Sequence, residues 1–325
     1  MVQRRIFRHI AGPELDDVPG KNGQPVVTTQ ITPDPEHTDP YIVALEGLSL
    51  EMGVHDLESL DRNRHLLPEK VRVYVNAVAG DGADARIRIA VQLADRGFQP
   101  APHIAARRTQ SVEALDNYLA SFAERAGVRD ILVIGGDLAE PLGPFDSALE
   151  VINSGLPTKH GIRRIGVAGY PDGHPFIDST ALGEALESKL TACTEAGIDP
   201  YIVTQFSFQA ESMIAWCCAM HEKHPDLPIH AGIPGPAKLG TLLRFARICG
   251  VQSSIKKLLA NKTVGLELLR RAAPWKQLEA IGRYRLETGL PLTAQLFTFG
   301  GITESVKWLQ QAQSGGERTS DEVIF

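Results

Sequence analysis

The sequence predicts an α/β protein built as a (β/α)8 TIM barrel, with an irregular N-terminal arm and extra helices before strand eight. Eight short apolar runs rich in Val and Ile alternate with longer segments that have helix-type spacing. The runs begin at intervals of roughly 30 residues, which is the length of one βα unit. Strands and helices that alternate in this way favour a barrel over a doubly wound sheet.

The predicted elements follow one another along most of the chain. The strands are Tyr41–Glu46, Val71–Val78, Pro100–Ile104, Asp130–Ile134, Arg164–Ala168, Pro200–Thr204, Pro228–Ala231 and Leu292–Thr298. Between them, Ser111–Gly127 and Ser179–Gly197 read as helices, and both end in Ala-Gly, which is a C-terminal helix signal. The long interval before the last strand predicts a helix after Pro236 and extra helices around Ser253–Glu287.

Length and composition suggest one large domain. The chain has 325 residues, and 43% of them are hydrophobic, which is enough to bury the core of a large barrel. Proline, glycine, aspartate and threonine dominate Gly12–Pro40, a composition typical of irregular structure. We therefore expect residues 1–40 to form an arm, residues 41–313 to form the catalytic barrel, and residues 314–325 to form a polar tail.

Charge and motifs narrow the class of protein. The net charge is −6, and the only clusters of basic residues are short pairs such as Arg107-Arg108, which argues against a nucleic-acid partner. The chain has no apolar run of about 18 residues and no visible secretory signal, so we expect a cytoplasmic protein outside the membrane. The usual metal-hydrolase, P-loop and serine-hydrolase motifs are absent, and the four cysteines lack C-x-x-C spacing, so no metal is expected.

Polar residues cluster where the predicted strands end. The C-terminal face of a (β/α)8 barrel carries the chemistry, so these residues form a candidate site. In chain order, the polar residues and their immediate neighbours at these strand ends are Glu46 with Glu51, Asn76, His103, Gly135-Gly136-Asp137, Tyr170 with His174, Gln205-Phe206, and Phe299. The two glycines before Asp137 would let a planar ligand approach the backbone closely.

Five of these strand-end motifs resemble the methylenetetrahydrofolate reductase family in order and spacing. They are Ala101-Pro102-His103-Ile104, Gly135-Gly136-Asp137, Val167–Pro171 with His174-Pro175, Val203–Phe206, and Gly232-Ile233. The resemblance covers about Tyr41 to Gln310 and implies the same barrel fold. It also implies noncovalent FAD and the interconversion of 5,10-methylenetetrahydrofolate and 5-methyltetrahydrofolate by hydride transfer through flavin N5.

The resemblance implies partners and a metabolic role as well. The partners are a tetrahydrofolate derivative and NAD(P)H or another electron donor, and a homo-oligomer remains open. The role is in one-carbon metabolism, including methionine biosynthesis. A competing hypothesis is a flavin- or folate-binding barrel without reductase activity, which acts as a carrier or a partner subunit.

The resemblance assigns roles to residues position by position. Asp137 corresponds to a carboxylate beside the flavin and the folate, and Gln205 to a glutamine that hydrogen-bonds the pterin. Phe206 and Phe299 line the substrate side. The expected cofactor-binding residues are Asn76, His103, Gly135, Gly136, Asp137, Tyr170, His174 and Lys189, the last of which corresponds to a lysine at the FAD phosphates.

A general acid must protonate the folate nitrogen, and the family uses a glutamate that ends strand one. Glu51, in Ser-Leu-Glu, resembles the local motif of that glutamate. Glu46 fits the predicted strand and the distance to Asn76 better, so it is favoured over Glu51. The chain also departs from the family pattern at Gly135, where an arginine is usual, and at Phe299-Gly300, which leaves the electron donor open.

Overall fold

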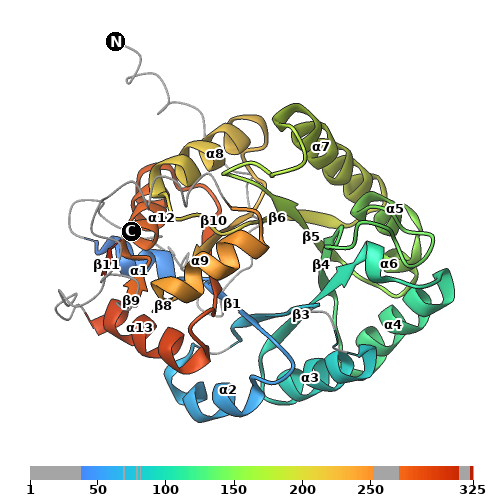
Figure 1. Cartoon of the computed structure of the whole chain (residues 1–325), viewed down its shortest axis with the longest axis horizontal. Coiled ribbons are helices and arrows are strands. Elements are labelled where there is room, and N and C mark those ends of the chain that lie inside the picture. Colours follow the sequence, from blue (N-terminus) through green and yellow to red (C-terminus); the bar gives the residue numbers. More distant parts are fainter. Residues whose placement is uncertain are drawn as a thin grey trace, which may run out of the picture. The chain divides into compact units, whose positions relative to one another are not determined.

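A ring of parallel strands surrounded by helices forms the core of the computed structural model (Figure 1). The structure describes residues 38–68, 70–77, 80, 82–251, 271–314 and 323–324, all of which belong to one compact unit. The barrel closes in the order β1-β10-β7-β6-β5-β4-β3-β2, and every neighbouring pair is parallel. This arrangement confirms the predicted (β/α)8 TIM barrel.

Seven of the eight barrel strands overlap the runs predicted from the sequence. The strands are β1 (Ser49–Met52), β2 (Arg72–Val75), β3 (Gln99–Ala105), β4 (Asp130–Ile134), β5 (Arg164–Gly169), β6 (Asp199–Thr204), β7 (Ile229–Pro234) and β10 (Leu292–Phe297). A separate small sheet contains β8 (Ala237–Lys238), β9 (Arg271–Ala273) and β11 (Val323–Ile324).

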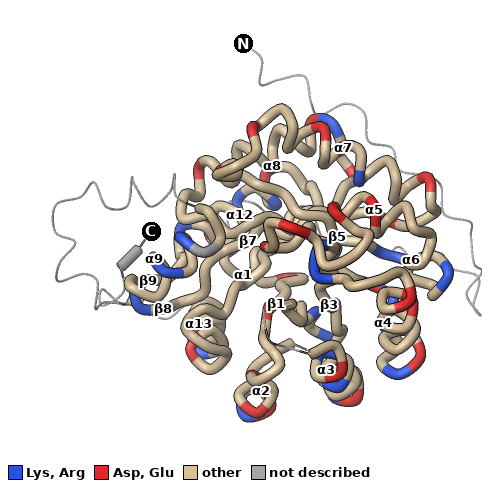
Figure 2. The backbone as a smooth tube through the Cα atoms, turned by 45° about the vertical axis from the view of Figure 1, so that its right-hand side comes forward, with Lys and Arg blue, Asp and Glu red and all other residues tan. Residues whose placement is uncertain are grey.

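Helices follow the strands and cover the outside of the ring. They include α2 (Leu57–Asn63), α3 (Ala83–Asp95), α4 (Val112–Arg125), α5 (Ala148–Asn153), α6 (Leu156–Lys159), α7 (Ser179–Glu195), α8 (Ala210–Lys223), α9 (Leu239–Ile248), α12 (Trp275–Thr288) and α13 (Ile302–Ser314). Figure 2 shows acidic and basic residues together on outer helices such as α3 and α4. In the part of the chain that the structure describes, no helix has the length and apolar character needed to cross a membrane.

The first predicted strand is wrong, because Tyr41–Glu46 lies mostly in helix α1 (Pro40–Leu45). The Asp39 side chain accepts a hydrogen bond from the Tyr41 backbone N–H at 2.9 Å and caps this helix. The ring of Tyr41 then packs edge-on against Trp275 of α12, with 5.9 Å between ring centroids. A six-residue apolar run fits a strand and a helix equally well, and here the N-cap and the contact with α12 favour the helix.

The predicted arm and tail lie largely outside the described residues. Of the region predicted to hold extra helices, Ser253–Glu287, the first part lies outside them as well, whereas the second part forms α12 (Trp275–Thr288), so a helix is confirmed there. The domain boundaries therefore stay predictions. Within the predicted tail, Val323–Ile324 forms β11, which pairs in parallel with β9.

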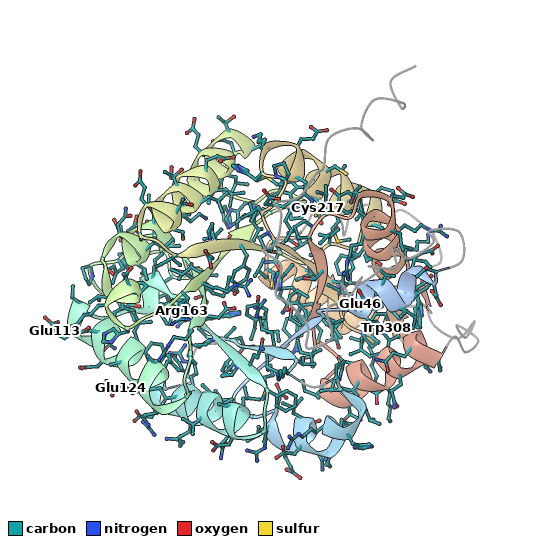
Figure 3. The ribbon with its side chains drawn as sticks, turned by 180° about the vertical axis from the view of Figure 1, so that it is seen from behind. Glu46, Glu113, Glu124, Arg163, Cys217 and Trp308 are labelled. Carbon is teal, nitrogen blue, oxygen red and sulfur yellow. The ribbon has the colours of Figure 1, made fainter. Side chains whose placement is uncertain are left out.

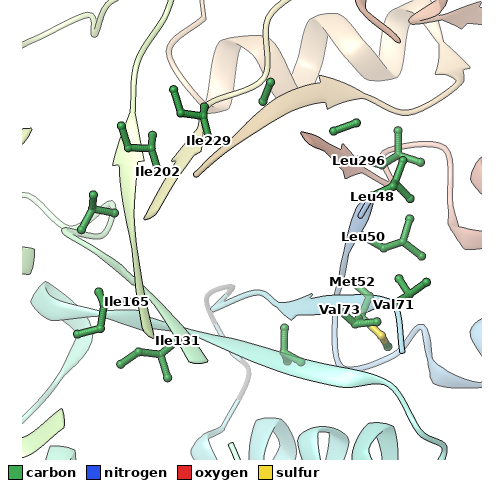
Figure 4. Packing of buried hydrophobic residues seen from close by; sticks show 14 of the residues in the cluster. Leu48, Leu50, Met52, Val71, Val73, Ile131, Ile165, Ile202, Ile229 and Leu296 are labelled. Atoms are coloured by element: carbon green, nitrogen blue, oxygen red, sulfur yellow. The ribbon is translucent and has the colours of Figure 1, made fainter. Parts of the chain in front are cut away.

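Apolar side chains on alternate strand residues form the layer between the strands and the helices. On β1, Leu50 and Met52 are fully buried in this layer, as are Val73 on β2 and Ile131 on β4 (Figure 4). Successive residues of a strand point to opposite faces, so Ser49 and Glu51 face the interior of the barrel.

Large rings fill the middle of the barrel, and one glycine makes room for them. The buried Tyr201 hydroxyl donates to the Asp130 carboxylate at 2.6 Å, and its ring crosses the interior. A Cβ on Gly166 would lie 2.7 Å from two carbon atoms of that ring. Both groups are enclosed by the barrel, so neither can move aside without disturbing the packing.

We expect Gly166→Ala to destabilise the fold by about 1–3 kcal/mol, because the added methyl group overlaps the Tyr201 ring. The free energy of unfolding in urea measures this effect. Gly183→Ala in the exposed part of α7 is the matched control, since a Cβ there meets nothing within 4 Å. That control should be neutral or slightly stabilising, and equal effects of the two substitutions would contradict the packing argument.

Candidate active site

Three polar side chains meet at the C-terminal mouth of the barrel, which is the end where the strands finish. Glu51 comes from β1, Asn76 follows β2, and His103 lies near the end of β3. The Asn76 amide nitrogen donates to Glu51 Oε1 at 3.4 Å, and His103 Nε2 lies 3.9 Å from Glu51 Oε2. These strands are neighbours in the barrel, so their alternation brings the three side chains to one level.

Burial changes the protonation of this cluster. Desolvation raises the pKa of Glu51 to about 7, and the Asn76 hydrogen bond opposes the rise. Burial, together with the positive charge of Arg86, lowers the pKa of His103 to about 3. His103 is therefore neutral at neutral pH, and its contact with Glu51 is not an ion pair. Glu51 is the group in this cluster that can hold and release a proton near pH 7.

The backbone around Glu51 is held from both neighbouring strands. The Thr298 hydroxyl, just after β10, donates to the Glu51 carbonyl at 2.7 Å. On the other side, the Asn76 N–H donates to the Met52 carbonyl at 3.0 Å. In contrast, two side-chain atoms of this cluster, Asn76 Oδ1 and His103 Nε2, are buried with no hydrogen-bond partner among the described residues. Such atoms are suited to accept or donate hydrogen bonds to a ligand.

Glu46, which was favoured as the general acid, does not join this cluster. It caps the end of α1, and its side chain is 64% exposed. Glu46 is labelled in Figure 3. Its carboxylate receives a hydrogen bond from Arg285 of α12 at 3.1 Å. Because Glu46 precedes β1 whereas Glu51 lies near its end, the two carboxylates belong to opposite ends of the barrel. The preference for Glu46 rested on the prediction that Tyr41–Glu46 is a strand, and the structure contradicts that prediction.

Asp137 lies in the loop after β4, where Gly135 and Gly136 leave the strand. Its carboxylate forms a two-pronged ion pair with Arg108, with distances of 2.7 and 2.8 Å. The guanidinium group lowers the pKa of Asp137, which therefore stays ionised. Gly136 has a φ of +99°, a conformation that favours glycine, and a Cβ on Gly135 would meet nothing within 4 Å. The loop thus offers open backbone beside a fixed carboxylate.

The β5–α7 loop carries Tyr170 and His174, whose rings meet edge-on with 5.4 Å between centroids. Burial raises the pKa of Tyr170 and lowers that of His174. Lys189, the predicted phosphate ligand, lies farther along the chain, as the eleventh residue of the helix α7 that follows this loop. At a rise of about 1.5 Å per residue it lies roughly 15 Å along the helix, where burial lowers its pKa.

Gln205 and Phe206 follow β6, but they have different surroundings. The Gln205 side-chain oxygen accepts from the Phe206 N–H at 3.1 Å, and its side chain is only half-buried. Phe206 is almost fully buried, and its ring packs against Phe299 at 4.9 Å and Phe297 at 5.5 Å. Phe206 therefore supports the wall of the site from behind, while the half-buried Phe299 stacks on Phe245 of α9 at 4.3 Å.

Helix α9 brings in a residue that the sequence did not indicate as part of the site. Cys249 caps this helix, and burial together with the charge of Glu51 raises the pKa of its thiol to about 11. The next residue, Gly250, packs so closely on Pro175 that a Cβ would lie 2.6 Å from that ring. The end of α9 thus meets the β5–α7 loop above the strands (Figure 1). The position of Cys249 near the site follows from the path of the chain after β7, which the sequence does not indicate.

The comparison with known families agrees with this geometry. The family model described as methylenetetrahydrofolate reductase matches residues 51–264, which is more than half of the chain. The chain belongs to the methylenetetrahydrofolate reductase family. The match begins at Glu51 and includes every residue of the mouth named above except those near β10.

Two curated members of the methylenetetrahydrofolate reductase family align with part of the chain. Methylenetetrahydrofolate reductase 2 of Saccharomyces cerevisiae is 32% identical over 143 residues, which are 42% of this chain and 22% of the yeast protein. Methylenetetrahydrofolate reductase (NADH) 1 of Arabidopsis thaliana is 27% identical over 173 residues, which are 49% of this chain and 28% of that protein. The chain thus matches less than a third of either relative.

The similarity to a solved structure confirms the fold and nothing beyond it. A protein from Clostridium thermocellum, described as binding two copies of 5-methyl-5,6,7,8-tetrahydrofolic acid, superposes with a TM-score of 0.53. The two sequences are 11% identical, and the superposition covers 84% of this chain and 98% of that one. At this identity the similarity concerns the barrel architecture.

We expect the buried Glu51 carboxyl to make stability depend on pH. Burial raises the pKa of Glu51 from its ordinary value of 4.5 to about 7. The stability that the protonated form contributes is therefore present below pH 4.5 and is lost as the pH rises through 7. Glu51→Gln removes this loss, which amounts to at most roughly 3 kcal/mol. The melting temperature of the variant relative to the wild type should therefore be higher at about pH 8 than at about pH 5.

Glu46→Gln is the control, because it makes the same change at an exposed carboxylate. It should keep the pH dependence of the wild type. A constant difference in melting temperature between Glu51→Gln and the wild type at both pH values would contradict the raised pKa.

Proposed function

We propose that the protein is a flavin-dependent oxidoreductase of one-carbon metabolism that interconverts 5,10-methylenetetrahydrofolate and 5-methyltetrahydrofolate. The observation that carries the proposal is Glu51, a buried carboxyl at the C-terminal mouth whose pKa is about 7. A general acid works best when its pKa lies near the working pH. Membership in the family supports the same reaction.

Glu51 is suited to protonate the folate nitrogen as the five-membered ring opens. Desolvation keeps a proton on the carboxyl at neutral pH, and Asn76 holds Oε1 in a fixed position. The strand and its hydrogen bonds on both sides keep the group from turning away. The neutral His103 cannot replace Glu51 as an acid, because its pKa is about 3.

The residues present at the mouth fit FAD as the cofactor. Asn76 Oδ1 and His103 Nε2 are buried without partners among the described residues, and they suit the polar edge of a flavin ring. Gly135 leaves open backbone where a flat ring can approach, and Tyr170 and His174 add aromatic surface. FAD, when bound, would accept and donate the hydride at flavin N5.

The remaining mouth residues suit the folate side. Asp137 keeps its negative charge because Arg108 lowers its pKa, and a fixed carboxylate stabilises a cationic folate intermediate. Gln205 presents an amide that can pair with the polar edge of a pterin, while its own oxygen is held by the Phe206 N–H. The donor that reduces the flavin is NAD(P)H or another reductant.

We expect the purified protein to be yellow and to release FAD on denaturation. In anaerobic solution, the visible absorbance of the flavin should bleach on addition of 5-methyltetrahydrofolate. Bleaching by NADH or by NADPH, each added to a parallel sample, identifies the electron donor. A protein that remains colourless with added FAD would overturn the proposal. A protein that binds FAD but does not bleach with any of these three would be a carrier or a partner subunit.

Glu51→Gln should retain FAD and lose folate turnover by about a hundredfold or more, because the amide cannot donate a carboxyl proton. Bleaching by NAD(P)H should be spared, since that step needs no protonation of folate. Glu46→Gln should turn over like the wild type, because its side chain pairs with Arg285 outside the mouth. Loss of turnover in Glu46→Gln with full activity in Glu51→Gln would reverse the assignment.

A further inference from the structure

A cavity lies at the N-terminal end of the barrel, where the strands begin. Its volume is about 600 Å³. Among the described residues, its polar lining includes Lys70, Arg72, Gln99, Arg164, His230 and Thr293. We call it the basal cavity. Arg72 and Arg164 are the first residues of β2 and β5, whereas Glu51 lies near the end of β1, so the basal cavity is separate from the mouth.

Two guanidinium groups share one carboxylate at this cavity. Arg72 Nη2 lies 2.8 Å from Asp130 Oδ2, and Arg164 Nη1 lies 3.8 Å from the same oxygen. Both guanidinium carbons also sit over the ring of Tyr201, at 5.3 and 5.0 Å from its centroid. The trio carries one positive charge in excess, and the Arg164 side chain is 36% exposed. Its remaining N–H groups are available to a ligand.

Other groups add to the positive character of the cavity. Lys70 supplies a third cation, and the acidic group of the lining, Glu46, is already paired with Arg285. Arg72 Nη1 donates to His230 Nε2 at 3.0 Å, so His230 is neutral and holds its proton on Nδ1. Burial keeps the pKa of His230 well below its usual range, and the positive charges of Arg72 and Arg164 lower it further.

One hydroxyl group of the cavity lining has no hydrogen-bond partner among the described residues. Thr293 Oγ1 is buried and makes no hydrogen bond to any described residue. A buried hydroxyl without a partner costs free energy, and a bound oxygen atom would satisfy it. Cations in excess and an unused hydroxyl together describe a site for an anion with several oxygen atoms.

We propose that the basal cavity binds a small oxyanion of the phosphate class, either inorganic phosphate or the phosphate of a small monoester. Arg164 and Lys70 would neutralise its charge, and the planar guanidinium group suits the geometry of phosphate oxygens. The volume of the cavity is within the usual range for small-molecule sites, so it has room for a phosphate group and the organic part of a small monoester. The proposal does not depend on the reaction at the mouth.

The test is calorimetric titration of the full-length protein with inorganic phosphate at constant ionic strength. Arg164→Gln and Lys70→Gln should each raise the dissociation constant about tenfold or more, because each removes a charge-assisted hydrogen bond. Both side chains are at least partly exposed, so these variants should fold, and their melting temperatures check this. Glucose phosphate in a parallel titration distinguishes a monoester from the free ion.

Two arginine variants serve as controls. Arg163, labelled in Figure 3, is the exposed neighbour of Arg164 and is not among the residues that line the cavity. Arg163→Gln should therefore keep the affinity of the wild type. Arg108→Gln removes a cation at the mouth and should also keep it. Phosphate binding that is absent, that is equal in all variants, or that is lost in Arg108→Gln rather than Arg164→Gln would overturn the proposal.

Discussion

The alternation of side chains along β1 decides which carboxylate enters the barrel. Leu50 and Met52 must point outward into the apolar layer under the helices, so Ser49 and Glu51 point inward. A slip of one residue would place Glu51 among apolar side chains and two large hydrophobic residues inside the mouth. The position of the Glu51 carboxyl group therefore depends on the burial of its two neighbours.

The closed ring then sets the chemistry of that carboxyl. Parallel pairing aligns Glu51 of β1 with Tyr74 of β2, and brings Asn76 and His103 to the same end of the barrel. The surrounding atoms exclude water, which raises the pKa of Glu51 and lowers that of His103. The pKa values of the two groups shift in opposite directions in the same environment, because desolvation disfavours the charged form, which is the deprotonated carboxylate of Glu51 and the protonated imidazole of His103.

The interior is polar at both ends, and large rings separate the ends. Tyr74 and Tyr201 fill the middle, where the Tyr74 hydroxyl donates to the Tyr201 hydroxyl at 3.3 Å, and Gly166 leaves the space that they need. Below them, the Arg72–Asp130 pair is largely buried, an arrangement that costs desolvation energy and is held by several hydrogen bonds. The rings keep this cationic region apart from Glu51, so each end has its own electrostatic character.

The sequence by itself determined the barrel, seven of its strands and most residues of the mouth. The reason is local, because a buried parallel strand reads as a short apolar run and its C-terminal end carries the polar residues. His103, Asp137 and Gln205 were identified from such strand ends, and all three follow or end barrel strands in the structure.

Only the tertiary structure decided the first strand, and with it which of the two carboxylates, Glu46 or Glu51, lies at the C-terminal mouth. A short apolar run such as Tyr41–Glu46 carries no period that distinguishes a helix from a strand. Its state is set by packing on α12, more than 200 residues away in sequence, where Tyr41 donates to Glu279 (sequence separation 238). The Arg108–Asp137 pair and the approach of Cys249 to Glu51 have the same origin, because each joins segments that meet only when the ring has closed.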